Sequence, residues 1–302
     1  MKTMKITHII FIVIVSLFVS CSDDDRIQDP VIDLYLDIPD VQFETKLINL
    51  GIDSDNEINQ QILRKDAENV LSLDLNSRSN NDEISDLTGV NGFVNLKSLF
   101  AVGNALTDID LSSNKLLDSL SLAGNSISSI DLSNNTKLVW LDLKVNNITA
   151  ISGLSNATSL KWLSLSFNLL EEFNIHNESL VNLLISDNLL TSFDASGAVN
   201  LESILLRTNL LAEIDLTSNT QLEVLVLSNN KIQNLNLESN NNLEYLYSSS
   251  SLLDNLDVSN LRELIDLRVD RNPNLLCIKI GTGQEIPTIS ISDYQELNTA
   301  CN

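Results

Sequence analysis

From residue 96 to residue 275, apolar and polar positions alternate in a pattern that returns about every 21 residues. The copy at residues 138–148 reads LVWLDLKVNNI, which follows the form L-x-x-L-x-L-x-x-N-x-L. The asparagine of one copy lies 20 to 22 residues after that of the copy before it, and Ser251 takes its place in one copy. The repeated asparagines are Asn104, Asn125, Asn146, Asn168, Asn188, Asn209, Asn230 and Asn272.

This pattern, in so many copies, is specific to leucine-rich repeats. Each L-x-L segment predicts a short strand whose leucines point to one side while the residues between them point to the other. One turn cannot bury its leucines alone, so neighbouring turns stack and their strands form a parallel sheet on the concave face. We expect the repeated asparagines to form a ladder that bonds buried backbone groups, because such groups cost about 1–3 kcal/mol each when unpaired.

The second half of each turn has a period of two, as in Ile130-Asp131-Leu132, and therefore predicts a short extended segment on the convex side. Two solenoid types remain open, an α/β-type horseshoe and a β-rich right-handed solenoid. A row of aspartates in these segments either binds Ca²⁺ between turns or makes local turn bonds. The row is Asp110, Asp131, Asp194, Asp215 and Asp257.

The ends of a solenoid expose apolar cross-sections that require covering. Residues 39–95 are expected to form an N-terminal cap with an irregular first repeat. Within it, a helix starts at Pro39-Asp40 and runs to about Leu50, and a second short helix spans residues 60–69. The repeats proper extend over residues 96–275, and a C-terminal cap follows at residues 276–302.

Residues between the strand leucines line the predicted concave face. Both tryptophans fall there on adjacent turns, with an apolar strip and a few cations beside them. Trp and Tyr are favoured at binding hot spots, so this face is the candidate ligand site. The alternative is that the stacked aromatics only support the sheet. The candidate residues are Trp140, Trp162, Asp142, Lys144, Leu184, Leu205, Arg207, Val226, Tyr245, Tyr247 and Arg268.

The first residues are expected to be a targeting segment rather than part of the fold. A basic start precedes an apolar run at residues 9–19, too short to span a bilayer and typical of a signal peptide. The following FVSC resembles a bacterial lipobox, which implies cleavage after residue 20 and lipidation of Cys21. The next residues, SDDD, resemble the acidic export signal of Bacteroidota surface lipoproteins. The alternatives are an ordinary signal peptide and a solvated charge run. Residues 21–38 then form an acidic tether.

Composition narrows the function. The chain of 302 residues carries 18 Lys+Arg against 41 Asp+Glu, a net charge of −23, which excludes a nucleic-acid backbone as partner. After the predicted signal peptide, His176 is the one histidine in the sequence, and we expect it on a convex turn. With no glycine-rich phosphate loop and no nucleophile elbow, we expect no enzyme, no cofactor and no metal site.

Cys277 and Cys301 are predicted to form a disulfide, since a bacterial surface is oxidising enough to keep one. The alternative is two free thiols. Closing the loop between them would stabilise the fold by roughly 3 kcal/mol in the chain-entropy model.

Segments in both caps, among them DIPD at residues 37–40, DLTG at residues 86–89 and NPNL at residues 272–275, resemble leucine-rich-repeat surface proteins of flavobacteria and other Bacteroidota. The repeats are also similar to internalin repeats. The resemblance implies interaction or adhesion by an outer-membrane lipoprotein exposed at the surface of a Gram-negative cell. We expect a protein ligand on the concave face. A glycan ligand and a mainly structural role are the alternatives.

Overall fold

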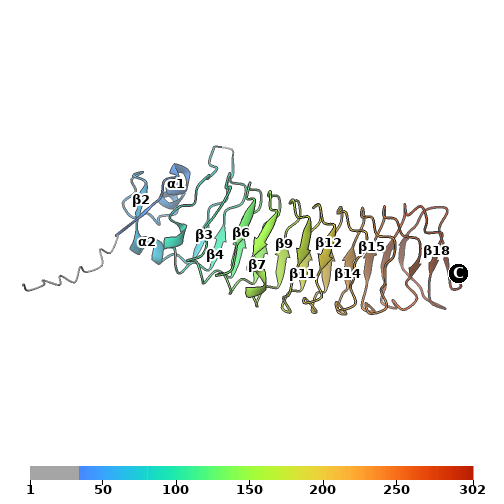
Figure 1. Cartoon of the computed structure of the whole chain (residues 1–302). Coiled ribbons are helices and arrows are strands. Elements are labelled where there is room, and N and C mark those ends of the chain that lie inside the picture. The colour runs from blue at the N-terminus through green and yellow to red at the C-terminus, as the bar shows by residue number, and fades with distance from the viewer. Residues whose placement is uncertain (1–33, 80, 302) are drawn as a thin grey trace, which may run out of the picture. The chain divides into compact units, whose positions relative to one another are not determined.

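The computed structural model describes residues 34–79 and 81–301, so the predicted signal peptide, Cys21 and most of the acidic tether lie outside the described residues. Eleven parallel strands form one main sheet in which neighbours along the sheet are also neighbours along the chain (Figure 1). In chain order they are β3 (Ser72–Asp74), β4 (Ser98–Phe100), β5 (Ser119–Ser121), β7 (Trp140–Asp142), β9 (Trp162–Ser164), β11 (Asn182–Leu184), β13 (Ser203–Leu205), β14 (Val224–Val226), β15 (Tyr245–Tyr247), β17 (Asp266–Arg268) and β19 (Thr288–Ser290).

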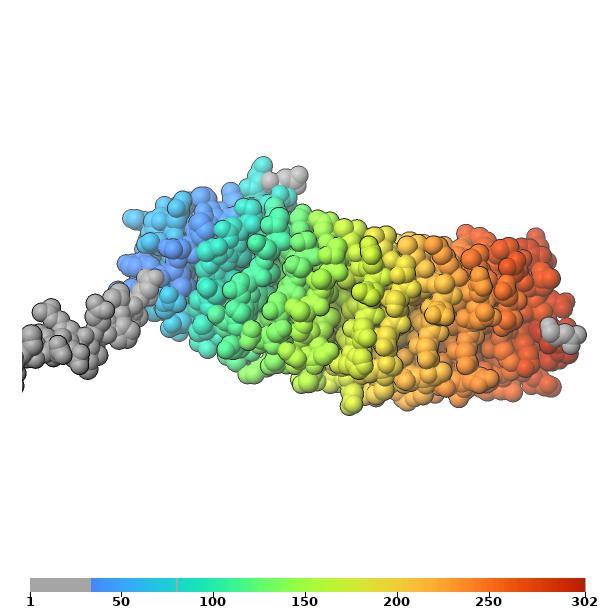
Figure 2. Space-filling view, viewed as in Figure 1, coloured from blue at the N-terminus to red at the C-terminus, as the bar shows by residue number. Residues whose placement is uncertain are grey.

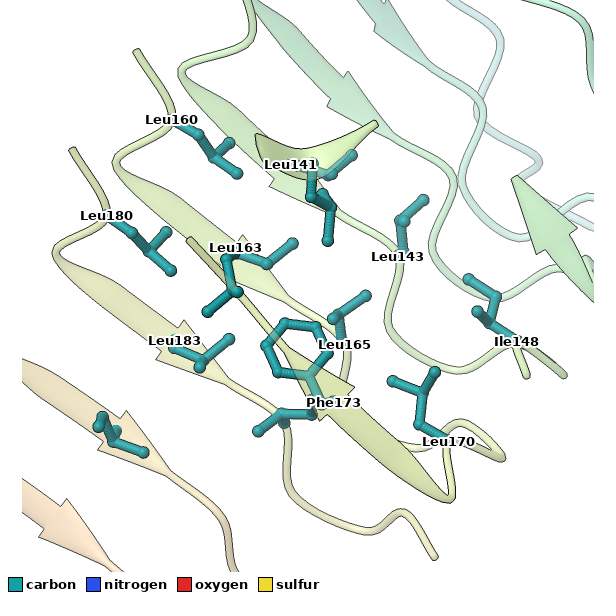
Figure 3. Close-up of a cluster of buried hydrophobic side chains, with 14 of the residues drawn as sticks. Leu141, Leu143, Ile148, Leu160, Leu163, Leu165, Leu170, Phe173, Leu180 and Leu183 are labelled. Atoms are coloured by element: carbon teal, nitrogen blue, oxygen red, sulfur yellow. The ribbon is translucent and has the colours of Figure 1, made fainter. Parts of the chain in front are cut away.

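The main sheet confirms the predicted leucine-rich repeat solenoid. Its register places equivalent positions of successive turns side by side, so that Leu141 pairs with Leu163, which pairs with Leu183. These leucines are fully buried. Figure 3 shows them in consecutive strands, together with Phe173 from the opposite side of the turn. In the space-filling view the turns follow one another as bands in chain order (Figure 2). Each turn therefore buries its apolar side chains against its two neighbours.

The repeated asparagines form a ladder inside the solenoid. Asn146 Nδ2 donates to Leu122 O at 2.9 Å and to Leu143 O at 3.1 Å, while its Oδ1 accepts from Ile127 N at 3.0 Å. One side chain thus satisfies three backbone groups in two consecutive turns. The same two-turn pattern holds at Asn104, Asn125, Asn168, Asn188, Asn209, Asn230 and Asn272.

Ser251 occupies the ladder position of its turn. It is buried, and its hydroxyl has no hydrogen-bond partner among the described residues. The hydroxyl is too short to repeat the three bonds of an asparagine. This turn therefore lacks the three ladder bonds that an asparagine makes at the other turns.

The residue before each ladder position has a left-handed backbone. Gly103 and Gly124 fill this position in two turns, each with φ of 69°. Val145 and Thr208 adopt φ of 56° although they are β-branched, a conformation that costs L residues about 1–2 kcal/mol. The stacked turns impose this geometry, and the side chains point outward at the edge of the sheet. The other residues of this row are Phe167, Asp187, Asn229, Ser250 and Arg271.

The side opposite the main sheet is built of short extended segments, as the period of two predicted. Among the described residues the helices are few, which decides for the β-rich solenoid and against the α/β horseshoe. The short 3₁₀ turns are η1 (Val90–Gly92) and η2 (Leu154–Asn156). The strands on this side are β6 (Ser129–Asp131), β8 (Ala150–Ser152), β10 (Glu172–Asn174), β12 (Ser192–Asp194), β16 (Leu256–Asp257), β18 (Cys277–Lys279) and β20 (Glu296–Asn298).

A second asparagine ladder runs beneath these segments, along a row of asparagines that recurs after them in the sequence. Asn135 Nδ2 donates to Leu111 O at 3.0 Å and to Asn114 O at 3.1 Å, again linking two turns. Asn156 belongs to this row by its place in the sequence, but it is exposed in η2, and the buried Asn177 makes the ladder bonds at the next turn. Similar bonds are made by Asn114, Asn219 and Asn240.

The aspartates of the opposite side make local turn bonds. Asp131 Oδ1 accepts from Ser133 N at 2.9 Å, and the bonds from Ser133 lower the pKa of the Asp131 carboxyl. Asp110, Asp194, Asp215 and Asp257 accept from the residue two positions later in the same way. No group of three His, Cys, Asp or Glu side chains suited to a metal ion occurs within residues 34–79 and 81–301. The geometry thus matches the turn-bond interpretation of this row.

The N-terminal cap contains the predicted first helix, α1 (Val41–Asn49), which Asp40 caps by accepting from Gln42 N and Phe43 N. The prediction of a helix over residues 60–69 was wrong at its start. Residues Gln61–Leu63 form β2, which pairs antiparallel with β1 (Tyr35–Asp37), and α2 (Arg64–Glu68) follows. The predicted tether was also too long, because β1 belongs to the cap. No described helix has the length and apolar character needed to cross a bilayer.

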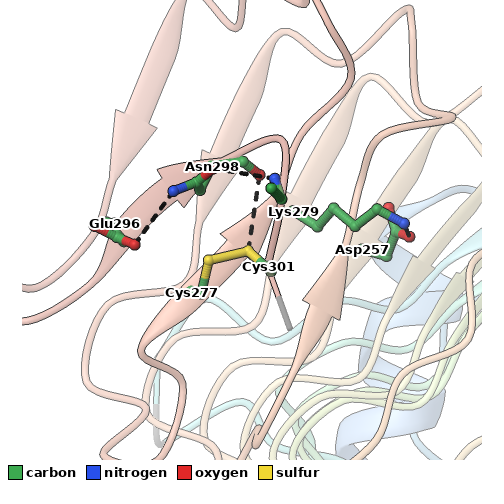
Figure 4. Close-up of a disulfide and its surroundings, with 7 residues drawn as sticks. Asp257, Cys277, Lys279, Glu296, Asn298 and Cys301 are labelled. Atoms are coloured by element: carbon green, nitrogen blue, oxygen red, sulfur yellow. Dashed lines mark hydrogen bonds and ion pairs between the residues drawn. A yellow bond between two sulfur atoms is a disulfide. The ribbon is translucent and has the colours of Figure 1, made fainter.

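The repeats continue beyond residue 275, so the predicted boundary of the C-terminal cap lies too early. Strand β19 extends the main sheet, and β18 and β20 extend the opposite side. Non-periodic spacing hid this turn, in which Gln284 and Gln295 donate to backbone carbonyls of the preceding turn as the asparagines do elsewhere. Cys277 and Cys301 form a disulfide that ties the chain end to β18 (Figure 4).

Asn146→Leu tests the ladder. Leucine has similar volume but leaves Leu122 O, Leu143 O and Ile127 N without their partner, at about 1–3 kcal/mol each. We expect the free energy of unfolding to fall by about 3 kcal/mol or more, measured by urea denaturation. The neighbouring Asn147 is exposed, and Asn147→Leu should change stability by less than about 0.5 kcal/mol. Equal losses in both variants would show that the ladder bonds contribute little.

Asp53 gives a pH-dependent prediction. Its side chain is 2% exposed, its Oδ2 has no partner within the described residues, and burial, with Asp55 nearby, raises its pKa to about 6. The folded state therefore holds this proton more tightly than the unfolded chain, whose value is near 3.8. Stability should fall as pH rises from about 4 to 6, by about 1–3 kcal/mol from this group.

Asp53→Asn should remove that decline and be more stable than the parent above pH 6. The measurement is the unfolding free energy between pH 4 and pH 8. Asp108 is exposed, so Asp108→Asn serves as the control and should keep the parental profile. An Asp53→Asn profile parallel to the parental one would contradict the buried-carboxyl explanation.

Candidate binding face on the main sheet

The outward side of the main sheet, here called the main-sheet face, presents two side chains from each three-residue strand. The middle residue of each strand points into the core and the flanking residues point outward. Strand pairing aligns these outward positions across the turns, about 4.8 Å apart. Side chains far apart in the sequence thus form continuous rows, as Leu184, Leu205, Val226 and Tyr247 do.

An aromatic cluster of Phe100, Trp140 and Trp162 lies toward the N-terminal end of this face. The two indoles stack with ring centroids 5.0 Å apart and planes 11° from parallel. The ring centroids of Phe100 and Trp140 are 6.1 Å apart. The two rings lie on either side of β5, in which the small Ser121 is buried. Both tryptophans remain half-buried rather than covered. The cluster is therefore a preformed apolar patch that is reachable from solvent, and Phe100 is a member that the candidate set omitted.

Asp142 and Lys144 lie on the same turn as Trp140. Asp142 is 6% exposed and its carboxylate is 3.6 Å from Lys144 Nζ, whereas the lysine is largely exposed. This ion pair places a cation beside the aromatic cluster. The neighbours of this ion pair on the main-sheet face are small or apolar.

A second group, Tyr247, Asp266 and Arg268, forms a rigid polar triad near the other end of the face. Tyr247 OH donates to Asp266 Oδ2 at 3.0 Å, and Arg268 Nη2 donates to the same oxygen at 2.7 Å. The guanidinium lies 4.5 Å above the Tyr247 ring. The bond from Arg268 lowers the pKa of Asp266, while burial and the bond to Asp266 raise the pKa of Tyr247. Asp266 was not among the candidates, yet it holds two of them in place.

A groove of about 770 Å³, here called the strand-end groove, follows the ends of the strands from β9 to β19. It is lined by five of the candidates, namely Leu205, Arg207, Val226, Tyr247 and Arg268. Phe167 also lines it and is 56% exposed, although the sequence pattern placed it outside the strand rows. Its position directly before a ladder asparagine was the signal available in the sequence.

The candidate residues therefore belong to two separate places. Trp140, Trp162, Asp142 and Lys144 surround the aromatic cluster, whereas the five groove residues begin two strands further along the sheet. Leu184 pairs with Leu205 and continues the apolar row, and Tyr245 points outward in the row of the tryptophans without lining the groove. His176 is exposed on the opposite side, as expected. The face offers apolar, aromatic and guanidinium contacts of the kind that bind macromolecules.

No family model and no curated protein sequence matches the chain. Solved structures do resemble it. The functional domain of InlJ from Listeria monocytogenes has a TM-score of 0.63 at 23% identity, over 86% of this chain and 62% of that one. Internalin C2 of Listeria monocytogenes has a TM-score of 0.59 at 20% identity, over 72% of this chain and 99% of that one.

A chain of the LRIM1/APL1C complex has a TM-score of 0.53 at 23% identity, over 71% of this chain and 45% of that one. This chain thus spans less than two thirds of the InlJ domain and less than half of the protein in that complex. At these identities the likeness shows the fold, a leucine-rich repeat solenoid of the internalin type.

Proposed function

We propose that this protein is a non-enzymatic lipoprotein of the cell surface that binds a protein partner through its main-sheet face. The observation that carries the proposal is the aromatic cluster, where stacked, half-buried indoles stand on a face of an otherwise highly acidic chain. Rigid aromatic side chains give large contact area at little entropic cost, which favours them as anchors for protein partners. Solvent-reachable apolar patches of this kind mark contact sites.

The likeness to internalins and to a chain of the LRIM1/APL1C complex supports a protein partner over other ligands. Leucine-rich repeats present extended binding surfaces because their strands align outward side chains over many turns. A glycan is the second candidate, since Trp140 and Trp162 offer indole surface on which a sugar ring stacks. The lipid anchor on Cys21 and the surface location rest on the sequence motif alone.

The test of the binding face is the double variant Trp140→Ala with Trp162→Ala. The parent, coupled to a resin, should retain specific proteins from biotinylated surface extracts of host and bacterial cells, and the variant should lose at least about nine tenths of that retention because hot-spot aromatics dominate affinity. Circular dichroism and thermal unfolding check that the fold persists. The matched control is Leu169→Ala with Leu189→Ala, which removes two exposed apolar side chains outside the strands.

Retention by the double tryptophan variant at the parental level would refute this face as the site. Glycan arrays probed with the same proteins separate the second candidate, because array binding lost in the tryptophan variant, without protein retention, would assign the site to a carbohydrate. If the parent retained neither class, the mainly structural role would be favoured.

Cys21→Ser tests the anchor. The parental chain should partition with the membrane fraction and incorporate labelled fatty acid, since more than one acyl chain gives stable anchoring. The variant should do neither. Protease treatment of intact cells should degrade the parental protein if it faces outward, whereas protection until the outer membrane is broken would contradict the surface location.

A further inference from the structure

The strand-end groove concentrates positive charge in a strongly acidic protein. Arg207, Arg268 and Arg271 line it, which are three of the seven arginines in a chain of net charge −23. Asp187 and Asp270 line it as well, and Asp266 is bonded to Arg268, so positive and negative charges balance here, whereas the chain as a whole is strongly acidic. An anionic group is therefore repelled less here than on the acidic surface elsewhere.

Arg207 differs from the other two arginines because its guanidinium is unpaired. Arg268 is bound to Asp266 and Arg271 to Asp270, each at 2.7 Å. Within residues 34–79 and 81–301, no carboxylate lies within ion-pair distance of Arg207, although Asp187 lines the same groove. Its neighbours in adjacent turns, Ser186 and Ser228, are small, so the guanidinium stands exposed with its donors unused.

The groove floor beside Arg207 is aliphatic. Leu205 and Val226 lie next to each other in paired strands and are half-buried. Their side chains offer apolar surface that has no hydrogen-bonding groups to satisfy. Two aromatic rings line this groove: Tyr247, which has one face covered by the Arg268 guanidinium, and Phe167, which is exposed at the end nearest β9. Next to Arg207 the groove is therefore aliphatic, with the exposed Phe167 ring lying at its end, and this arrangement suits apolar side chains of an extended peptide.

We infer that the strand-end groove binds an acidic segment of a polypeptide. An Asp or Glu carboxylate of the partner accepts two hydrogen bonds from the Arg207 guanidinium, and an adjacent apolar side chain packs on Leu205 and Val226. The inference rests on the proposed function, to which it adds the chemistry of the partner. Arg207 lies two turns beyond Trp162, so a substitution at Arg207 leaves the aromatic cluster in place and the two sites can be tested with separate variants.

The experiment selects random linear peptides displayed on phage against the full chain and, in parallel, against the full chain carrying Arg207→Gln. Peptides enriched on the parent should carry Asp or Glu beside Leu, Ile, Val or Phe. Peptides enriched on the variant should lack the acid. A synthetic peptide from the parental selection should bind Arg207→Gln about tenfold or more weakly in fluorescence anisotropy, as expected for the loss of a charge-assisted pair.

A double-mutant cycle assigns the contact. Replacing the peptide's acid by its amide should weaken binding to the parent but not to Arg207→Gln. Arg262 is exposed outside the groove, and Arg262→Gln is the matched control that should bind like the parent. Val226→Thr, which is nearly isosteric, should weaken binding by removing apolar contact.

The inference is overturned if the selected peptides carry no acid, if none is enriched, or if Arg207→Gln binds them as the parent does. Binding of uronic or sialic acid glycans by the parent, lost in Arg207→Gln, with no peptide enrichment, would overturn it in favour of an anionic sugar. In each case the tryptophan variant still decides separately whether the main-sheet face binds a protein.

Discussion

The need to pair buried backbone groups governs this solenoid. A turn of about 21 residues buries carbonyl and amide groups where it bends away from the strand, and no secondary structure lies close enough to pair them. Asn146 solves the problem for two turns at once, because an amide side chain donates and accepts simultaneously. A leucine core alone would leave these groups orphaned, and each orphan costs about as much as burying a leucine gains. The second ladder, with Asn135, repeats the solution on the opposite side.

The features that recur in every turn could be predicted from the sequence. The strands, the inward leucines and the ladder positions recur in copy after copy, so an error in one copy is corrected by the others. Among the features that occur once, the first cap helix and the disulfide were predicted, but others were not. Strand β1 pairs with β2 across the intervening helix α1. In the last turn Gln284 and Gln295 take the role of asparagine, at positions that depart from the spacing of about 21 residues.

The binding face shows a similar division between pattern and geometry. The pattern identified which residues point outward, because strand alternation settles that. It did not separate the aromatic cluster from the strand-end groove, since distance across a sheet depends on register. Nor could it show that Arg268 is held by Asp266 while Arg207 is not, because ion pairs depend on rotamers and neighbours that the sequence does not encode locally. The fold could therefore be predicted from the sequence pattern, whereas the arrangement of the binding sites could be seen only in the three-dimensional structure.

The turn of Ser251 has a mechanical meaning. In a linear stack each turn is bonded only to its neighbours, so a pull along the long axis passes through every junction in series and parts the weakest first. The buried hydroxyl of Ser251 makes none of the ladder bonds that asparagine makes at the other junctions. Tyr247, which lines the strand-end groove, belongs to the same turn. A pull along the long axis would therefore open the solenoid at this junction, within the span of the strand-end groove, rather than at its tip.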